Sequence, residues 1–403
     1  MLRFETAGES HGECLVATLS GLPAGIPISL EYLNRQLWRR QQGFGRGGRM
    51  KIETDRAHVV SGIRYSQTIG SPIAILLANQ DWKNWADTLP IEAPVEASVE
   101  VSIGSQSAPA PVTNRPVSRP RPGHADLPGA IKYNLPEARY ILERASARET
   151  AARVAVGALA KTFLAQFGIG VLSHVVSVGP VRLKRRSHWE ELVALSEKDE
   201  VLLGCVDPET EAEMKAVVDQ AYRTGDTVGG IFEVVAHALP PGLGSHITWD
   251  SRLDGKLAQA IVSIQAVKGA EIGYAEEGAA SFGSAVQDTI HYRKEEREFY
   301  RGSNRAGGLE GGITNGEDLV VRGFLKPIST LRRPLESVDL GTRDPALAAY
   351  ERSDVAVVPA AGVIGEAMVA LVLAQAFLEK FGGDSLLETK RNYDSYLAQV
   401  KSY

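Results

Sequence analysis

The chain has 403 residues, with 44 Lys and Arg against 49 Asp and Glu, so its formal net charge at pH 7 is −5. With 44% hydrophobic and 23% charged residues it is ordinary for a soluble globular protein, which excludes collagen-like, coiled-coil and wholly disordered chains. Only Cys14 and Cys205 are present, which argues against a disulfide framework and excludes a thiolate metal site, and we expect no metal. The amino terminus lacks a signal-peptide pattern, and we expect no run of about 18 apolar residues that could span a bilayer. We therefore expect a cytoplasmic protein with no membrane partner.

Predicted helices and strands are mixed along the chain. A helix begins after Ser29, which is suited to cap it, and repeats leucine at 30, 33 and 37. Apolar runs bounded by turn-forming residues predict strands at 72–79, 170–179, 229–239 and 318–326. Between the first two strands, residues 94–122 hold six of the twenty prolines and predict a mobile loop.

Two long helices share the pattern L-A-x-x-F-L-x-x-F-G, at 159–168 and 373–382. Each ends in Gly, which favours a helix C-terminus, and Ala and Val around most of both helices indicate an interior position. We predict an α+β fold with these helices buried between sheets. The repeat predicts one domain of two related halves, about 1–200 and 201–385, followed by a C-terminal tail at 385–403.

Residues 35–51 contain six Lys or Arg and no acid, which indicates that an anion is held there. A solvated basic face is the alternative. The pattern G-x-G-x-x-G also occurs at Gly43, Gly45 and Gly48, but a helix precedes it where a dinucleotide site requires a strand, so we reject that interpretation.

Three further basic loops follow. Arg115, Arg119 and Arg121 lead to His124; Arg144 and Arg148 flank Ser146, which could serve as a helix cap alone; and Lys326 lies close to Ser329 and Thr330. Together the four loops predict a polyanionic small-molecule ligand. A nucleic-acid-binding protein is the alternative, but the net charge is −5, the basic groups are scattered, and no basic stripe is interleaved with aromatic residues.

Two of the eight histidines are candidates for acid catalysis. His11 and His124 are preceded or followed by Gly on predicted loops, where an exposed imidazole can act as a general acid. His174 and His237 lie in apolar strand patterns and are interpreted as core residues.

Eight ordered motifs between residue 3 and about residue 382 resemble the chorismate synthase family. They are AGESHG (7–12), RRQQGFGRGGRMKIETD (39–55), RPGHADL (121–127), ERASARET (143–150), SIQAVKG (263–269), GGLEGGITNG (307–316), KPIST (326–330) and ERSD (351–354). The resemblance implies a carbon–oxygen lyase that converts 5-enolpyruvylshikimate 3-phosphate to chorismate by 1,4-anti-elimination of phosphate, using reduced FMN without net redox change. It also implies a β-α-β sandwich with internal duplication and antiparallel sheets, and a homotetramer.

The resemblance assigns roles residue by residue. Ser10 and His11 match the pair at the substrate phosphate, His124 a histidine near the flavin ring, and Asp354 an acid near flavin N5 that relays the substrate proton. The positions that match FMN contacts are Arg144, Ala145, Ser146, Gln265, Ala266, Gly311, Lys326, Pro327, Ile328, Ser329, Thr330 and Arg352. Arg40 and Arg46 match NADP(H) or substrate positions, and Arg49, Arg121 and Arg148 match arginines around the substrate anions.

Three residues depart from the family pattern. Ala145 and Gln265 replace a usual Ser and a frequent Asn, and Ser353 replaces a common His, but none of these changes removes a proposed catalytic group. The resemblance leaves open whether NADPH reduces the flavin on this chain or an external reductase does so. A flavin store without turnover also remains an alternative.

Overall fold

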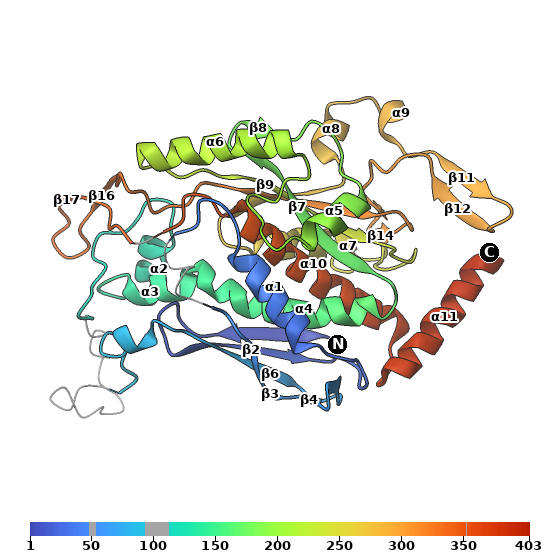
Figure 1. Ribbon diagram of the computed structural model, residues 1–403, viewed down its shortest axis with the longest axis horizontal. Coiled ribbons are helices and arrows are strands. Elements are labelled where there is room, and N and C mark those ends of the chain that lie inside the picture. The colour runs from blue at the N-terminus through green and yellow to red at the C-terminus, as the bar shows by residue number, and fades with distance from the viewer. Residues whose placement is uncertain (48–53, 93–112, 352) are drawn as a thin grey trace.

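Two antiparallel sheets enclose a layer of helices in the computed structural model, which describes residues 1–47, 54–92, 113–351 and 353–403 (Figure 1). The first sheet has the strand order β1 (Arg3–Ala7), β2 (Cys14–Ser20), β6 (Ile73–Ala78) and β3 (His58–Ser61). The second has the order β10 (Val267–Ile272), β15 (Leu319–Leu325), β9 (Gly230–His237), β7 (Gly170–Val178) and β8 (Val181–Arg182). The expected β-α-β sandwich with antiparallel sheets is confirmed.

Helices α1 (Leu30–Gln41), α4 (Thr150–Ala165) and α10 (Val358–Phe381) lie between the sheets (Figure 1). α4 packs on β2 and β6 of the first sheet, α10 packs on β7 and β9 of the second, and the two helices pack on each other. At their crossing, a Cβ atom on Gly157 would lie 2.3 Å from the Cβ of Ala367. The close approach of α4 and α10 therefore requires glycine at position 157.

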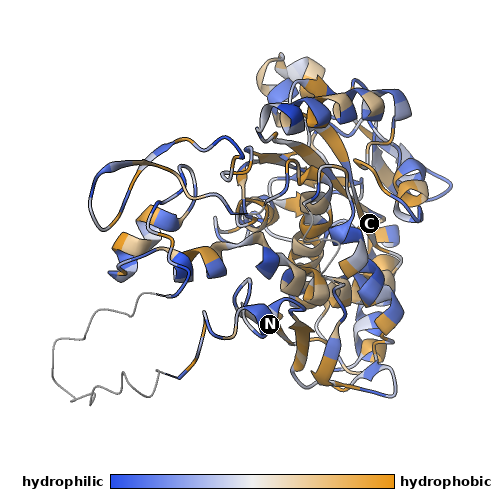
Figure 2. Ribbon diagram, turned by 60° about the vertical axis from the view of Figure 1, so that its left-hand side comes forward, coloured by the Kyte–Doolittle hydropathy of each residue, from blue (hydrophilic) through white to orange (hydrophobic). Residues whose placement is uncertain are grey.

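Alternation along the strands explains which face of the first sheet is buried. Leu15, Ala17 and Leu19 of β2 are buried, and they pair across the strands with Leu77, Ile75 and Ile73 of β6, which are buried as well. Successive residues of a strand point to opposite faces, so these six side chains form one apolar face against α4. Figure 2 shows the same concentration of hydrophobic residues in the interior helices and strands.

α10 is long and apolar enough to cross a membrane by length and composition, and among the described residues it alone passes that test. However, its residues are mostly buried between the second sheet and α4, which is the environment of a core helix.

Further elements surround the sandwich. They are β4 (Ile63–Arg64), β5 (Gln67–Thr68), η2 (Trp82–Asn84), α2 (Asp126–Tyr133), α3 (Arg139–Ala145), η4 (Ala147–Glu149), α5 (Trp189–Ser196), α6 (Pro208–Thr224), α8 (Ala275–Ala279), α9 (Gly283–Val286), β11 (Ile290–Arg293), β12 (Glu298–Arg301), β13 (Leu309–Glu310), β14 (Ile313–Thr314), β16 (Glu336–Val338), β17 (Pro345–Leu347) and α11 (Leu386–Ser402).

Most local predictions agree with these bounds. The four predicted strands correspond to β6, β7, β9 and β15, and the Ser29 side chain caps α1 by accepting a hydrogen bond from the Tyr32 backbone N–H. Ser146 caps the 3₁₀ turn η4 instead of α4 itself, because α4 begins only at Thr150. The segment designated as a C-terminal tail is the helix α11, which the Ser385 side chain caps.

The strands β7 and β8 precede residue 200 but pair within the second sheet. The chain therefore passes from the first sheet to the second before the boundary expected between the two halves. Residues 94–112 of the proline-rich segment lie outside the described residues.

Candidate active site

The predicted site loops meet at the end of the sandwich where α4 and α10 begin and α1 ends (Figure 1). Hydrogen bonds join these loops: the Arg46 guanidinium donates to the Arg40 carbonyl oxygen, and the Arg40 guanidinium reaches the Thr150 hydroxyl. The N-terminal ends of two helices carry partial positive charge, so α4 and α10 both favour an anion at this end of the molecule.

A buried ion triplet lies at the first turn of α4. Asp55 accepts hydrogen bonds from Arg40 Nη2 at 2.7 Å and from Arg148 Nη1 at 2.5 Å, and all three side chains are at most 4% exposed. Burial alone would raise the pKa of Asp55, but the two guanidinium groups hold that pKa below its ordinary value. Two cations share one carboxylate, so the triplet carries a net positive charge suited to an anionic ligand.

His11 is held from two directions. Glu143 accepts hydrogen bonds from the His11 backbone N–H at 2.8 Å and from its ring Nδ1 at 3.0 Å. The imidazole also stacks on the Trp85 indole, with ring centroids 3.9 Å apart and planes inclined by 21°. The buried Ser10 hydroxyl donates to the Ser146 hydroxyl at 3.1 Å, so the Ser10–His11 pair lies against the ERASARET turn.

Arg121 and His124 share the carboxylate of Asp126. Arg121 Nε donates to Asp126 Oδ2 at 2.8 Å, and His124 Nδ1 lies 2.5 Å from Asp126 Oδ1. The pKa of Asp126 is well below its ordinary value, because hydrogen bonds from His124 and Arg121 outweigh the effect of burial. Arg121 Nη1 also donates to the buried hydroxyl of Thr330 at 2.8 Å, which ties this loop to the KPIST loop.

Asp354 joins the arginine-rich loop to the start of α10. Its Oδ1 accepts from the Gly47 backbone N–H at 2.5 Å, and its Oδ2 lies 3.2 Å from Arg46 Nε. The neighbouring Ser353 hydroxyl donates to the Thr330 carbonyl oxygen at 3.0 Å. The loops that contain Arg46, Thr330 and Asp354 therefore meet in one place.

The residues predicted to contact FMN form two adjacent groups beside these loops. Lys326 Nζ donates to the Ser329 hydroxyl at 2.8 Å, and its backbone N–H donates to the Ala266 carbonyl oxygen at 3.0 Å. Burial and the nearby Lys268 lower the pKa of Lys326. Ala266 has a left-handed backbone with φ of 66°, an uncommon conformation for a non-glycine residue and one that often marks a functional site.

Gln265 contacts the same turn as Ser146. Its Nε2 donates to Glu149 Oε2 at 3.2 Å, whereas its buried Oε1 accepts no hydrogen bond from the described residues. Arg144 is more exposed and donates to the carbonyl oxygens of Thr6 and Gly8 at 2.8 and 3.1 Å.

The Ile328 carbonyl oxygen, in the KPIST loop, accepts from the Thr227 hydroxyl at 2.8 Å.

Gly311 is the one described site residue that the structure does not bring to this place. It lies in the turn between β13 and β14, where its carbonyl oxygen accepts from Arg252 at 3.2 Å, next to the start of α7 (Leu253–Val262). Gln265 follows the opposite end of that helix. Arg49 and Arg352 lie outside the described residues, so the structure does not locate these two predictions.

The sequence alone does not predict which residues hydrogen-bond to, or stack on, the basic side chains of the site. These partners are Asp55, Asn79, Trp85, Asp126 and Glu143. Asp55, Asp126 and Glu143 each lie within or at the end of a basic motif, and that position was the available signal. Asn79 is different, since its link to Arg148 Nε, at 2.9 Å, spans 69 residues and leaves no sequence signal.

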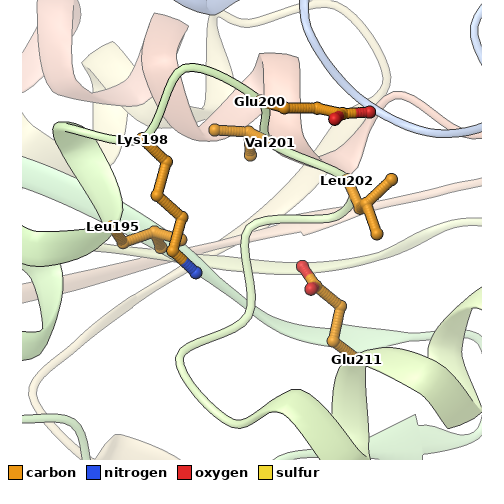
Figure 3. Close-up of a pocket in the computed structure, with 6 residues that line it drawn as sticks. All are labelled: Leu195, Lys198, Glu200, Val201, Leu202 and Glu211. Carbon is orange, nitrogen blue, oxygen red and sulfur yellow. The ribbon is translucent and has the colours of Figure 1, made fainter.

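A pocket of about 220 Å³ lies apart from these residues, lined by Leu195, Lys198, Glu200, Val201, Leu202 and Glu211 (Figure 3). The Phe44 backbone N–H donates to the Leu202 carbonyl oxygen at 2.6 Å, so the pocket lies behind the loop that contains Arg46. None of the predicted site residues lines it. We therefore place the candidate active site at the charged cluster and not at this pocket.

Comparisons with known proteins agree with the motifs. A family model described as chorismate synthase matches residues 2–378. Proteins named chorismate synthase from Solibacter usitatus (strain Ellin6076) and Koribacter versatilis (strain Ellin345) are 73% and 62% identical, over the full length of both chains in each case.

A solved structure titled "Crystal Structure of Chorismate Synthase" matches with a TM-score of 0.77 and 43% identity, covering 100% of this chain and 99% of the other. These comparisons give no support to the nucleic-acid-binding alternative. The chain therefore belongs to the chorismate synthase family of carbon–oxygen lyases.

Proposed function

We propose that this chain converts 5-enolpyruvylshikimate 3-phosphate to chorismate by 1,4-anti-elimination of phosphate. The substrate carries two carboxylates and a phosphate. The observation that supports the proposal most is the buried triplet of Arg40, Asp55 and Arg148, which leaves one positive charge beside the N-terminus of α4. In such a site, fixed cations stabilise the charge that develops on a departing phosphate.

His11 and Ser10 are proposed to act at the phosphate end of the substrate. Glu143 engages His11 Nδ1, so Nε2 is the ring nitrogen available to donate a proton to the leaving phosphate oxygen. Ser10 would donate a hydrogen bond from its hydroxyl. Arg49, Arg121 and Arg148 are proposed to bind the substrate anions, and the bidentate geometry of guanidinium suits carboxylate and phosphate groups.

The residues proposed to hold FMN fit that group on two observations. Among the described residues, Lys326 Nζ has hydrogen bonds only to neutral oxygens, so its charge is available to a phosphate. The buried Gln265 Oε1 lacks a donor within the described part of the chain, which suits a ligand N–H or O–H. The other proposed contacts are Arg144, Ala145, Ser146, Ala266, Pro327, Ile328, Ser329, Thr330 and Arg352, whereas Gly311 lies too far from them in this chain, at the other end of α7. Reduced FMN, when bound, supplies a transient electron donor and a proton acceptor without being consumed.

His124 and Asp354 are proposed to manage charge and protons on the cofactor side. The Asp126 carboxylate holds His124 at Nδ1, so its Nε2 can face a negative charge. The Asp354 carboxylate is held by Gly47 and Arg46 and would pass the substrate proton onwards. In these roles Asp126 keeps its contact with His124, and Asp354 keeps its contacts with Gly47 and Arg46.

We further propose a cytoplasmic homotetramer built from chains of two related halves, with Arg40 and Arg46 near NADPH where that nucleotide serves as reductant. Both side chains are largely buried and ion-paired, Arg40 with Asp55 at 4% exposure and Arg46 with Asp354 at 9% exposure. Membership of the chorismate synthase family supports these expectations, and the pattern shared by residues 159–168 and 373–382, at the C-terminal ends of α4 and α10, is compatible with duplication.

An anaerobic assay tests the reaction. Purified protein with reduced FMN and 5-enolpyruvylshikimate 3-phosphate should release chorismate and phosphate in equal amounts, with far less than one oxidised flavin per turnover. Binding of flavin without chorismate formation would favour a flavin store. One oxidised flavin per chorismate under strict anaerobiosis would refute the redox-neutral reaction.

A further inference from the structure

We propose that Glu143 and Trp85 are positioning residues for His11. Glu143 fixes which ring nitrogen faces the substrate, and Trp85 fixes the plane of the imidazole ring. The inference rests on the role proposed above for His11. Neither residue touches the predicted ligands in this assignment, and both act through the imidazole.

The Glu143 carboxylate controls the edge of the ring. Its side chain is 0% exposed, and its two oxygens accept from the His11 backbone N–H and from Nδ1, at 2.8 and 3.0 Å. A buried carboxyl oxygen that accepts a hydrogen bond at Nδ1 favours the form of imidazole with a proton on that nitrogen. Nε2 then remains as the nitrogen that can exchange a proton with a ligand.

Trp85 controls the face of the same ring. The indole lies 3.9 Å from the imidazole centroid, and its Nε1–H donates to Asp81 Oδ2 at 3.2 Å, which limits rotation of the indole. Arg115 and Arg139 also lie against the indole, 4.5 and 5.3 Å from its ring centroid. The imidazole could therefore tilt away from Glu143 only by breaking its stacking contact with the Trp85 indole, which these neighbours hold in place.

Charged groups around the pair agree with this arrangement. Arg139 Nη1 lies 3.6 Å from Glu143 Oε1, so a guanidinium group also faces this carboxyl group. Glu143 also accepts from Ser10 N–H through its own carbonyl oxygen, at 3.0 Å. Glu143 therefore contacts both members of the Ser10–His11 pair from the helix that precedes the ERASARET turn.

The fluorescence of Trp85 tests the arrangement without any substrate. An imidazole stacked on indole quenches indole emission. Glu143→Gln replaces charge-assisted hydrogen bonds by weaker neutral ones, so it should loosen the ring and raise the tryptophan emission of the purified protein. The rise should vanish in a Trp85→Phe background and persist in a Trp249→Phe background, because Trp249 is 87% exposed and serves as the matched control. An unchanged emission in Glu143→Gln would overturn the proposal.

A double-mutant cycle tests the coupling to catalysis. Groups that orient a metal-bound histidine through its second nitrogen contribute about 10- to 100-fold to activity. We expect Glu143→Gln to lower kcat by a similar factor, with little change in the KM for substrate. In a His11→Asn background the same substitution should change kcat by less than about twofold, because the two effects are not additive when one residue acts through the other. Additive losses would assign Glu143 a purely structural role.

Two further outcomes keep the test decisive. Glu143→Asp retains the charge but retracts it by one methylene, so it should recover part of the lost kcat even where the Gln variant folds poorly. Trp85→Leu should lower kcat in the wild-type background and leave the His11→Asn variant unchanged. If the wild-type protein forms no chorismate, the proposed function fails, whereas the fluorescence result still decides whether Glu143 holds the ring.

Discussion

Asp55 Oδ2 and Arg40 Nη2 lie 2.7 Å apart, and the two side chains are only 0% and 4% exposed. Asp55 holds Arg148 with its other oxygen, and Arg148 in turn donates to Asn79. One buried carboxylate therefore fixes two arginines from different motifs at the start of α4.

Removal of this carboxylate should destabilise the protein strongly. Breaking a buried ion pair by removing one partner costs about 3–5 kcal/mol, because the remaining charges stay buried without compensation. We expect a loss of that size for Asp55→Asn, measured by urea unfolding at pH 7. Asp318→Asn is the matched control, since Asp318 pairs with a half-exposed His237 and such pairs contribute about 0–1 kcal/mol. Equal losses in the two variants would contradict the assignment.

The buried Glu366 predicts how stability depends on pH. Glu366 accepts from Arg39, Lys161 and Ser173 in the middle of α10, and these cations lower its pKa to about 2 in spite of burial. A carboxyl whose pKa falls on folding stabilises the protein fully above its unfolded value, about 4.3, and loses that contribution as the pH falls towards 2.

The difference in unfolding free energy between the wild type and Glu366→Gln should therefore be largest at pH 6–7 and shrink as the pH falls from about 5 to 2. A shift of this size corresponds to roughly 3 kcal/mol. Urea midpoints at several pH values measure it. A difference that stays constant from pH 7 to pH 3 would show that the Glu366 charge does not contribute.

Asp354→Asn should lower turnover while the protein stays folded. A positioned acid or base contributes about 10²- to 10⁴-fold, and the amide cannot accept the proton. Flavin affinity should change little, because the proposed phosphate contacts lie on the 326–330 loop. Anaerobic chorismate formation and flavin titration are the two measurements. Near-normal turnover in flavin-binding protein would remove Asp354 from the mechanism.

Arg46→Ala should weaken ligand binding more than folding. A hydrogen bond to a charged group contributes about 1.5–3 kcal/mol, which corresponds to about 10- to 150-fold in affinity. We expect an increase of this size in the KM for the substrate or for the nicotinamide nucleotide, with a smaller change in the thermal midpoint. Unaltered kinetics for both ligands would show that Arg46 serves only its buried ion pair with Asp354.

His124→Ala should lower turnover by about 10²- to 10⁴-fold with a small effect on flavin affinity. Asp126→Asn provides the comparison, because Asp126 holds His124 Nδ1 and two guanidinium nitrogens of Arg121. Loss of that carboxylate should impair turnover and also raise the KM for the substrate, since it releases Arg121. Identical KM values in the two variants would show that Arg121 does not contribute to substrate binding.

The sequence by itself determined the local elements and the family. Alternation and apolar runs located β6, β7, β9 and β15, and Ser29 marked the start of α1, because these features depend on residues near each other in the chain. The ordered motifs identified the chorismate synthase family, and the basic loops indicated an anionic ligand.

Only the tertiary structure decided which groups meet. Glu143 lies 132 residues from His11, and Asp55 lies 93 residues from Arg148, so no local pattern could pair them. Their contacts exist because α4 and α10 begin at the same end of the sandwich and bring the ends of α1, α3 and β15 together there. Gly311 and Gln265 belong to motifs assigned to one ligand, but the same packing places them at opposite ends of α7. A helix rises about 1.5 Å per residue, so its length keeps the two residues apart.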